Sequence, residues 1–298
     1  MIKRILLTLG LLAVIAIGGF YIWRYERIHR PRLQLFNAER AYQDVVYQTS
    51  LGPRTPGSEA HEQAIDYFRN ELQKANWQVD VQVTEVNGHI LKNVIARRSD
   101  MPPQIILGAH YDSRLMADRD PDLQKQQEPV PGANDGASGA AVLLELGRVL
   151  PPNSVPIWLV FFDAEDQGHI PGWEEWSLGA SSFVQQFSLK PRAVVIVDMV
   201  GDSNLNIFQE KQSDARLVRE IWDVAQKLGY WQYFLPEQKY TITDDHVPFL
   251  EAGIPAVDII DMEYRYWHTS YDTANKVSPA SLGIVGTTLQ AWIAQQKR

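Results

Sequence analysis

Acidic and histidine side chains directly follow the apolar segments of this sequence. The run PIWLVFF is followed by three acids within four residues, Asp163, Glu165 and Asp166. His110 follows QIILGA, and Asp198 ends AVVIVD. The parallel strands of an open α/β sheet bring their carboxyl ends to one edge, where binding sites form. The spacing therefore predicts that these side chains converge on one site.

Two loops add further candidates, Asp135 in GANDGASG and His268 in WHTSYD. Carboxylates crowded away from water are unfavourable unless a cation compensates their charge. Imidazole and carboxylate ligands without thiolate suit zinc, and a catalytic zinc keeps three protein ligands and one open position. Since the chain contains no cysteine, the residue types predict a zinc site of this kind.

Each candidate also has a structural interpretation when it is taken alone. His110 could bond to backbone at a strand end, and Asp135 could cap the helix that follows it. Asp198 could bond loop amides, and His268 could lie in a surface loop. The recurrence of acids and histidines at successive strand ends favours the metal site. Asp163 is expected to have a structural role, such as orienting a histidine. The other histidines lack this context and are interpreted as structural or solvated: His29, His61, His89 and His169.

Glu165 and Asp166 are adjacent, which suggests that they divide the work. Neighbouring side chains diverge on a turn that leaves a strand, so one can face the metal and the other the substrate. We assign Asp166 as a ligand and Glu165 as a general base. Trp173 and Trp176 follow in the same loop and could either wall a small, dry pocket or serve only in packing.

Continuous apolar segments alternate with helical patterns from residue 33 onward. Strands are predicted at 77–86, 91–98, 104–109, 156–162, 193–200 and 254–260. Helices are predicted at 38–51, 59–75, 137–150, 213–229 and 278–296, the second with Ser58 as its N-cap. This order predicts a single α/β domain over residues 33–298, with a mostly parallel mixed sheet flanked by helices.

Composition and charge exclude several classes of protein. With 298 residues and 45% hydrophobic side chains the chain can bury a full core, so global disorder is excluded. A net charge of −8 argues against a nucleic-acid-binding protein, which would present a basic face. The lack of cysteine excludes disulfides, thiolate zinc sites and cysteine nucleophiles.

Residues 1–32 are interpreted as a membrane anchor with a basic juxtamembrane segment. The uncharged run 5–23 follows Lys3 and Arg4, and its length approaches the ~20 residues that span a bilayer as a helix. A cleaved signal peptide is the alternative, but its best cleavage site would leave the apolar FYIW behind. The arginines that follow the run outnumber the two basic residues before it, which favours a cytoplasmic C-terminal side.

The motifs HYDSR, GANDGASG, FFDAED, VDMVG and WHTSYD, in this order, resemble those of the zinc aminopeptidase and glutaminyl cyclase superfamily. The closer resemblance is to the glutaminyl-peptide cyclotransferases of animals and bacteria. It rests on long matches over HYDSRLMADRDPD and FFDAEDQG, on DDHVPFLEAGIPAVDII, which begins at Asp244, and on Trp267 directly before His268. The resemblance implies a three-layer fold of the zinc-exopeptidase type. It also implies a domain outside the cytoplasm, against the arginine count.

The resemblance further implies a role for each matched residue. It places one zinc on the three ligands Asp135, Asp166 and His268. It makes Glu165 the catalytic acid and base. The residues that would hold the substrate or pass its protons are Asp198, Asp245, His246 and Trp267.

The reaction that the resemblance implies is cyclisation of an N-terminal glutamine of a peptide to pyroglutamate, with release of ammonia. The alternative is an aminopeptidase, in which a second zinc would bind His110 and Asp198, with Asp135 as the bridge. Aminopeptidases of the superfamily usually have two acids at Asn134–Asp135 and two glutamates at Glu165–Asp166, so both differences favour the cyclase. A non-enzymatic binding module is least favoured because every ligand position is filled.

Overall fold

A six-stranded sheet forms the centre of the protein. The structure is a computed structural model that describes residues 34–152 and 154–297. The strands run in the order β1-β2-β4-β3-β5-β8. Their bounds are β1 Gln78–Val86, β2 His89–Arg97, β3 Ile105–His110, β4 Ile157–Phe162, β5 Ala193–Asp198 and β8 Ala256–Ile260. β4, β3, β5 and β8 are parallel, whereas β1 and β2 pair antiparallel with each other and β2 pairs antiparallel with β4. The sheet is therefore mixed and mostly parallel, as predicted.

The sequence pattern of each strand reflects its place in the sheet. Every residue of β3, β4 and β5 is buried, which requires a continuous apolar run because both faces are covered. β1 lies at the edge and alternates between more and less exposed residues, so its sequence QVDVQVTEV alternates too.

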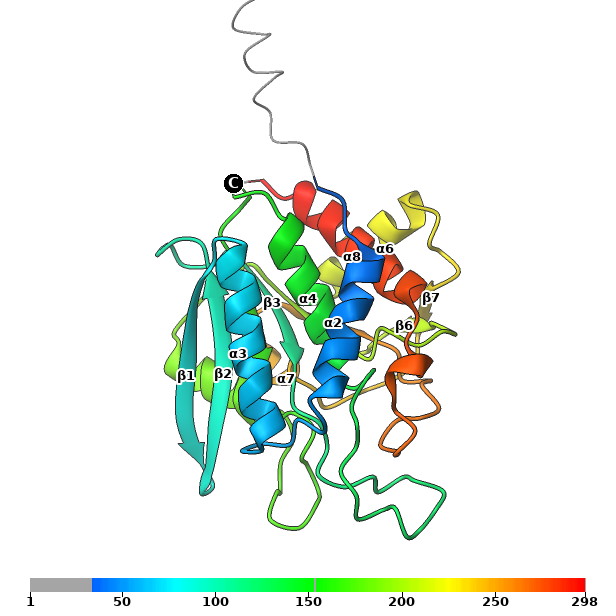
Figure 1. Ribbon diagram of the computed structural model, residues 1–298. Coiled ribbons are helices and arrows are strands. Elements are labelled where there is room, and N and C mark those ends of the chain that lie inside the picture. The colour runs from blue at the N-terminus through cyan, green and yellow to red at the C-terminus, as the bar shows by residue number, and fades with distance from the viewer. Residues whose placement is uncertain (1–33, 153, 298) are drawn as a thin grey trace, which may run out of the picture. The chain divides into compact units, whose positions relative to one another are not determined.

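Helices cover both faces of this sheet (Figure 1). One face packs against five helices, α2 Ala38–Ser50, α3 Glu59–Lys74, α4 Ala137–Val149, α6 Ala215–Lys227 and α8 Pro279–Ala294. The other packs against α5 Leu178–Gln186 and α7 Val247–Glu251. Successive residues of one strand serve the two cores, as Leu159 belongs to the first and Val160 to the second. The smaller elements are β6 Ile207–Gln209, β7 Phe234–Gln238 and the 3-10 helix Ala274–Lys276.

The predicted helix starts depend on local capping. The Ser58 side chain accepts a hydrogen bond from the backbone of His61 at 3.1 Å, so this N-cap is confirmed. α4 begins without such a cap and is instead pressed against β5. A Cβ atom placed on Gly139 would lie 2.0 Å from the carbonyl oxygen of Val197. Only glycine permits this approach of helix to strand.

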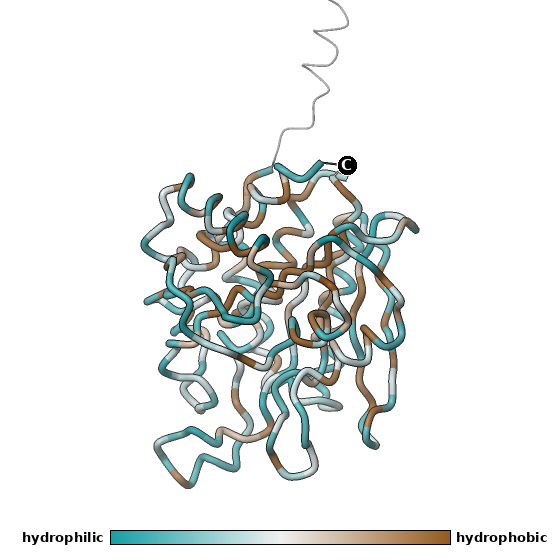
Figure 2. Tube along the Cα trace, turned by 180° about the vertical axis from the view of Figure 1, so that it is seen from behind, coloured by the Kyte–Doolittle hydropathy of each residue, from teal (hydrophilic) through white to brown (hydrophobic). Residues whose placement is uncertain are grey.

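The two poles of the domain differ in what they hold. The parallel strands end at the pole where the long loops lie, and the described residues begin and end at the other (Figure 1). At that second pole the N–H of Phe36 donates to Oε1 of Gln290 in α8, at 3.0 Å. The backbone trace is most hydrophobic in the central strands and mostly hydrophilic along the outer loops (Figure 2).

Among the described residues, no helix combines the length and apolarity that a bilayer crossing requires. The predicted anchor at 5–23 lies outside the described residues.

Candidate metal centre

The carboxyl ends of the parallel strands bring the predicted site residues together. His110 ends β3, Glu165 and Asp166 lie in the loop after β4, and Asp198 ends β5. Asp135 lies just before α4, and His268 lies in the loop after β8. All six are at most 6% exposed. Six titratable groups from five segments thus share one buried region.

Asp135, Asp166 and His268 form a first cluster, whose ligand atoms lie within 4.8 Å of one another. Nε2 of His268 is 2.9 Å from Oδ1 of Asp166 and 3.9 Å from Oδ2 of Asp135. Oδ2 of Asp135, Oδ2 of Asp166 and Nε2 of His268 are buried without a hydrogen-bond partner.

The donor atoms of this first cluster fit a metal ion. Buried polar atoms normally have partners, so three such atoms facing one another indicate a missing ligand. Two carboxylates and one imidazole, with no thiolate in the chain, are a donor set that zinc accepts. Burial, together with the nearby charge of Asp135, raises the pKa of Asp166 to about 6. A cation in the cluster would remove this penalty for ionising Asp166.

His110, Asp135 and Asp198 form a second cluster, which shares Asp135 with the first. Nε2 of His110 lies 3.0 Å from both Oδ1 of Asp135 and Oδ1 of Asp198. Burial alone would lower the pKa of His110, but the charges of its acidic neighbours raise it well above its ordinary value. The imidazole therefore lies where it can compensate the charge of the two carboxylates that a second metal would need. Burial raises the pKa of Asp198 to about 7, although His110 opposes the shift.

Asp272 and Gly136 fix the position of the shared ligand Asp135. The carboxylate of Asp272 accepts hydrogen bonds from the backbone N–H groups of Asn134 and Asp135, at 2.9 and 3.2 Å. The peptide bond between Asp135 and Gly136 is cis. A Cβ atom at position 136 would lie 2.5 Å from the imidazole of His110, so a glycine is needed beside the ring.

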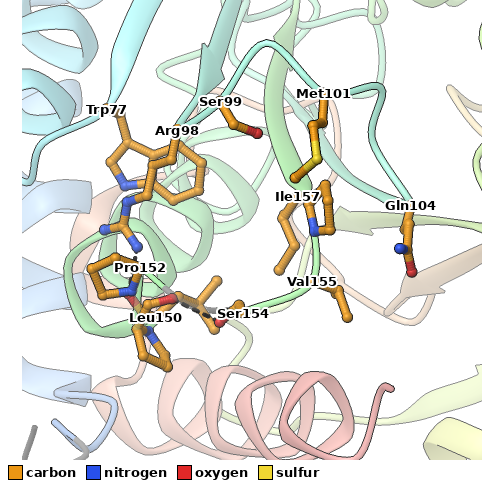
Figure 3. Close-up of a pocket in the computed structure, with 12 residues that line it drawn as sticks. Trp77, Arg98, Ser99, Met101, Gln104, Leu150, Pro152, Ser154, Val155 and Ile157 are labelled. Carbon is orange, nitrogen blue, oxygen red and sulfur yellow. Dashed lines mark hydrogen bonds between the residues drawn. The ribbon is translucent and has the colours of Figure 1, made fainter. Parts of the chain in front are cut away.

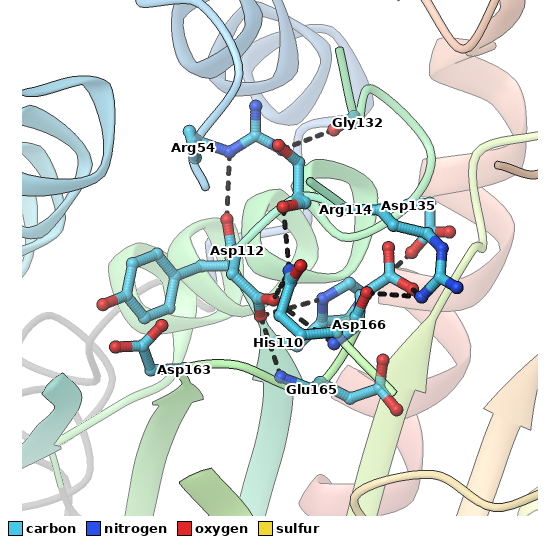
Figure 4. A network of polar contacts seen from close by, with 12 residues as sticks. Arg54, His110, Asp112, Arg114, Gly132, Asp135, Asp163, Glu165 and Asp166 are labelled. Carbon is cyan, nitrogen blue, oxygen red and sulfur yellow. Dashed lines mark hydrogen bonds and ion pairs between the residues drawn. The ribbon is translucent and has the colours of Figure 1, made fainter. Parts of the chain in front are cut away.

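Asp112 holds the loop that carries Glu165 and Asp166 (Figure 4). Its carboxylate accepts hydrogen bonds from the backbone N–H groups of both residues, at 3.1 and 3.2 Å. The side-chain amide of Gln167 donates to the same carboxylate at 2.8 Å. Oδ1 of Asp112 also lies 3.4 Å from Nδ1 of His110. One buried acid thus aligns the ends of β3 and β4.

Asp118 and Arg114 lie behind His268. Nδ1 of His268 is 3.2 Å from Oδ1 of Asp118. Arg114 donates from two nitrogens to the carboxylate of Asp118, at 2.8 and 2.9 Å. Burial alone would raise the pKa of Asp118, but the bonds from His268 and Arg114 hold it well below its ordinary range. Burial would likewise lower the pKa of His268, yet Asp166 and Asp118 raise it to about 9.

A pocket of about 250 Å³ opens onto the first cluster. It is lined by Asp135, Glu165, Asp166, Trp176, Asp198, Met199, Thr241, Ile242, Thr243, Asp244, Ile260, Met262 and Trp267. Acids and the metal cluster therefore share its wall with two tryptophan rings. Arg119 stacks over the ring of Trp267, with its guanidinium carbon 4.0 Å from the ring centre.

Glu165 lies in this pocket as a buried carboxylate. Its Oε1 accepts a hydrogen bond from the hydroxyl of Ser177 at 3.2 Å. Burial, followed by the negative charge of Asp244, raises the pKa of Glu165 well above its ordinary value. A carboxyl group tuned in this way holds a proton readily, which is what a general acid and base needs.

Several other predicted residues lie outside the pocket lining. Trp173 is buried and stacks on His89 with ring centres 3.6 Å apart, so its role here is packing. His246 and Asp245 are fully buried behind the pocket. The acid that reaches the lining is the neighbouring Asp244. The adjacent pair of acids was the signal in the sequence, but nothing in it showed which one turns inward.

His246 lies in a third buried cluster with Asp244 and Asp258. Its Nε2 is 3.2 Å from Oε2 of Glu210, and its Nδ1 is 3.8 Å from Oδ2 of Asp258. Burial and the charges of Asp244 and Asp198 raise the pKa of Asp258 well above its ordinary value. Burial and the nearby negative charge thus favour the protonated form of Asp258.

The sequence predicted a structural role for Asp163, and the structure shows what it contacts. Oδ1 of Asp163 lies 2.9 Å from Nε2 of His61, and its Oδ2 accepts from the backbone of Lys92 at 2.7 Å. His61 is not in either metal cluster. No role was predicted for three acids that support the site: Asp112, Asp118 and Asp272. Two of them follow a candidate ligand within the motifs HYD and WHTSYD, which was the available signal.

A larger cavity of about 320 Å³ lies at the opposite end of the sheet (Figure 3). None of the residues that line it is an acid or a histidine. Arg98 stacks on Trp77 with its guanidinium carbon 4.2 Å from the ring centre, and it donates to the carbonyls of Leu150 and Gly147. This cation thus serves the C-terminus of α4.

Comparison with known proteins agrees with this geometry. The sequence profile described as Peptidase family M28 matches residues 93–293, a range that includes every residue of the two metal clusters. The chain belongs to peptidase family M28. Its sequence is 24% identical to that of a glutaminyl-peptide cyclotransferase of the snake Boiga irregularis, over 92% of this chain and 88% of that protein.

Two solved structures extend the comparison. The glutaminyl cyclase of Tannerella forsythia matches with a TM-score of 0.82 and 33% identity, over 89% of this chain and 100% of that one. A leucine aminopeptidase precursor from Bacteroides thetaiotaomicron matches with a TM-score of 0.84 and 30% identity, over 89% and 99%. The overall fold is thus common to proteins named for two reactions, and the site must distinguish them.

Proposed function

We propose that this protein is a zinc-dependent glutaminyl cyclase, which converts the N-terminal glutamine of peptides to pyroglutamate and releases ammonia. The observation that carries the proposal is the difference between the two clusters. In the first cluster Nε2 of His268 lies within 3 Å of one carboxylate only, and Asp135 and Asp166 each keep a buried Oδ2 without a partner, whereas Nε2 of His110 in the second cluster lies 3.0 Å from an oxygen of each of its two carboxylates. This arrangement supports one metal ion, held by Asp135, Asp166 and His268.

The pocket fits a single residue better than an extended peptide. Its volume of about 250 Å³ lies below the range of about 300–1,000 Å³ usual for ligand pockets. A glutamine side chain can fold between the rings of Trp176 and Trp267, which brings its α-amine towards its own γ-carbonyl. Because both reacting groups belong to one residue, the pocket mainly has to hold them close together.

The acids of the pocket can carry the protons of this reaction. A zinc ion in the first cluster would polarise the γ-carbonyl of the glutamine. Glu165 accepts a proton from the α-amine as its nitrogen bonds to the γ-carbon. Glu165 then returns the proton to the amide nitrogen, whose bond to that carbon breaks, and ammonia leaves. Asp198 and Asp244 line the same pocket and can hold the amine.

Asn134 supports the cyclase over the two-metal alternative. Its Oδ1 accepts from the backbone of Gly201 at 2.6 Å, and its Nδ2 donates to the carbonyl of Met199 at 3.2 Å. An aspartate at this position could not donate the second bond. The amide thus ties the Asp135 turn to the end of β5 without adding a negative charge to the site.

The deciding experiment gives the purified, zinc-loaded protein two peptides that differ only in an N-terminal Gln or Leu. Mass spectrometry should show loss of one ammonia from the Gln peptide and no change in the Leu peptide. Release of whole N-terminal residues would instead establish an aminopeptidase. His110 and Asp198 would then be ligands of a second zinc, and metal analysis should find two ions per chain.

We also propose that residues 5–23 anchor the protein in a membrane and that the catalytic domain lies outside the cytoplasm. The run of uncharged residues supports the anchor, and the resemblance to exported enzymes supports the side. A reporter that is active only in the cytoplasm, fused to the C-terminus, should stay inactive. An active reporter would place the domain inside, as the arginine count suggests.

A further inference from the structure

The segment 114–120 lies beside the loop that carries His268 and contacts it through consecutive residues. Nδ1 of His268 faces Asp118, the backbone N–H of Arg119 donates to the carbonyl of His268 at 3.2 Å, and Asp120 accepts from the backbone of Ser270 at 2.8 Å. His268 itself has φ = 57°, in the left-handed region. A non-glycine residue keeps such a backbone only where its surroundings hold it.

The ring of His268 has two nitrogens with different surroundings. Nε2 faces Asp166 at 2.9 Å and Asp135 at 3.9 Å, inside the first cluster. Nδ1 faces the carboxylate of Asp118 at 3.2 Å, on the outer side. An ionised carboxylate only accepts, so Nδ1 must carry a hydrogen. The neutral ring then has its lone pair on Nε2, where a metal would bind.

Asp118 is 37% exposed, so water alone would leave it free to turn. Arg114 prevents this, because its side chain is 2% exposed and its guanidinium donates to both oxygens of Asp118. The same guanidinium donates to the backbone carbonyl of Asp166 at 2.9 Å (Figure 4) and to that of Gly168 at 3.2 Å. One cation thereby sets the positions of two ligands, one through Asp118 and one directly.

We infer that Asp118 is a positioning residue for the metal, which fixes the tautomer and the direction of His268 and is itself locked by Arg114. This inference rests on the proposed zinc site but not on which reaction the site performs. Acids that bond the outer nitrogen of a ligand histidine typically change metal affinity by ~10- to 100-fold when they are removed. The segment 114–120 would thus be part of the metal site, although no atom of it is a ligand.

The test measures zinc affinity by competition with a chelator, on the purified full-length chain and without substrate. Asp118→Ala should weaken zinc binding by ~10- to 100-fold. Asp118→Asn should weaken it less, because its amide oxygen can still accept from Nδ1. The matched control is Asp122→Ala, since within residues 34–152 and 154–297 the carboxylate of Asp122 accepts only from the backbone of Gln124. The control should bind zinc as the wild type does.

A structural role alone would give a different pattern. The melting temperature of the zinc-free protein should be nearly the same for the wild type and Asp118→Ala. A large drop there that matched the lost affinity would overturn the inference, and so would zinc binding of wild-type strength in Asp118→Ala. Release of leucine instead of ammonia would refute the proposed cyclase and leave these zinc results valid. A wild-type protein that binds no zinc would refute both.

Discussion

Glu165 lines the same pocket as Asp135 and Asp166 of the first cluster and as Asp244, whose negative charge helps to raise its pKa. Replacing it with glutamine keeps the shape and removes the proton carrier. We expect Glu165→Gln to lower kcat by ~100- to 10,000-fold, the usual contribution of a general acid and base. Zinc content should stay unchanged, because Glu165 is not in the metal clusters. Steady-state kinetics and metal analysis measure both.

The control for that variant is Glu175→Gln, an exposed acid in the same loop. It should retain full activity. Normal turnover by Glu165→Gln would assign the proton transfer to another acid of the pocket, with Asp198 and Asp244 the first to examine.

Two tryptophans three residues apart should respond differently to alanine. Trp176 lines the pocket, so Trp176→Ala should raise KM for Gln peptides by ~10-fold, a loss of about 1.4 kcal/mol of ring contact. Trp173 stacks on His89 and is 8% exposed. Trp173→Ala should therefore cost about 3 kcal/mol of folding stability. Steady-state kinetics and thermal unfolding of both variants measure these effects. A raised KM in Trp173→Ala with normal stability would contradict the assignment.

At the scale of elements, the contact between α4 and β5 fixes the start of α4, and with it the position of Asp135 just before that helix. A Cβ atom on Gly139 would collide with the backbone of β5, whereas one on Gly147 of the same helix would meet the end of the Leu72 side chain at 2.7 Å. A side chain can turn away, but a strand carbonyl cannot. Gly139→Ala should thus lose at least about 1–3 kcal/mol, and Gly147→Ala should lose clearly less. Urea unfolding would show it.

The sequence predicted the central strands and long helices well because their burial leaves a clear pattern. β4 is apolar throughout, β3 and β5 are apolar up to their last residue, and α3 has a side-chain cap. It did not predict α5, α7, β6 or β7. α7 spans only Val247–Glu251, too short for a periodic pattern, and α5 starts after Ser177 with no cap hydrogen bond.

The ligands and their supports were not equally visible in the sequence. His110, Asp166 and Asp198 stand at or just after strand ends, where an acid or histidine is unexpected. Asp118 stands within LMADRDPD among other charges, and its contact with His268 joins segments 150 residues apart. Such a pairing depends on how two loops fold together, which no local pattern records. The same holds for Asp244, since its neighbour Asp245 has the same chemistry but does not line the pocket.

At the scale of the molecule, buried acids make stability depend on pH. Asp261 is fully buried and accepts hydrogen bonds from the backbones of Asn206 and Glu263. Burial raises its pKa from 3.8 to about 7. Because the folded pKa is the higher one, its contribution to stability is complete below about pH 4 and is lost as the pH rises through about 7.

Asp261→Asn removes this titration. The free energy of unfolding of the wild type, measured relative to Asp261→Asn, should fall between about pH 4 and pH 7 and then level off. Urea unfolding at several pH values measures the difference. Asp66→Asn on α3 controls for the loss of one surface charge. A wild-type advantage that grew with pH would contradict the predicted sign.

The described chain starts and finishes at one pole of the domain (Figure 1), and the pocket is lined mostly by residues at or beyond the carboxyl ends of the strands, which lie at the other pole. A domain built this way can be immobilised through either end of the described chain without blocking the opening of the pocket. Beads or sensor chips that capture the protein through a tag at residue 34 or at the C-terminus should therefore leave it as active as the free enzyme. In a cell, the same geometry would leave the pocket of a membrane-attached copy open to the N-termini of peptides that diffuse near that membrane.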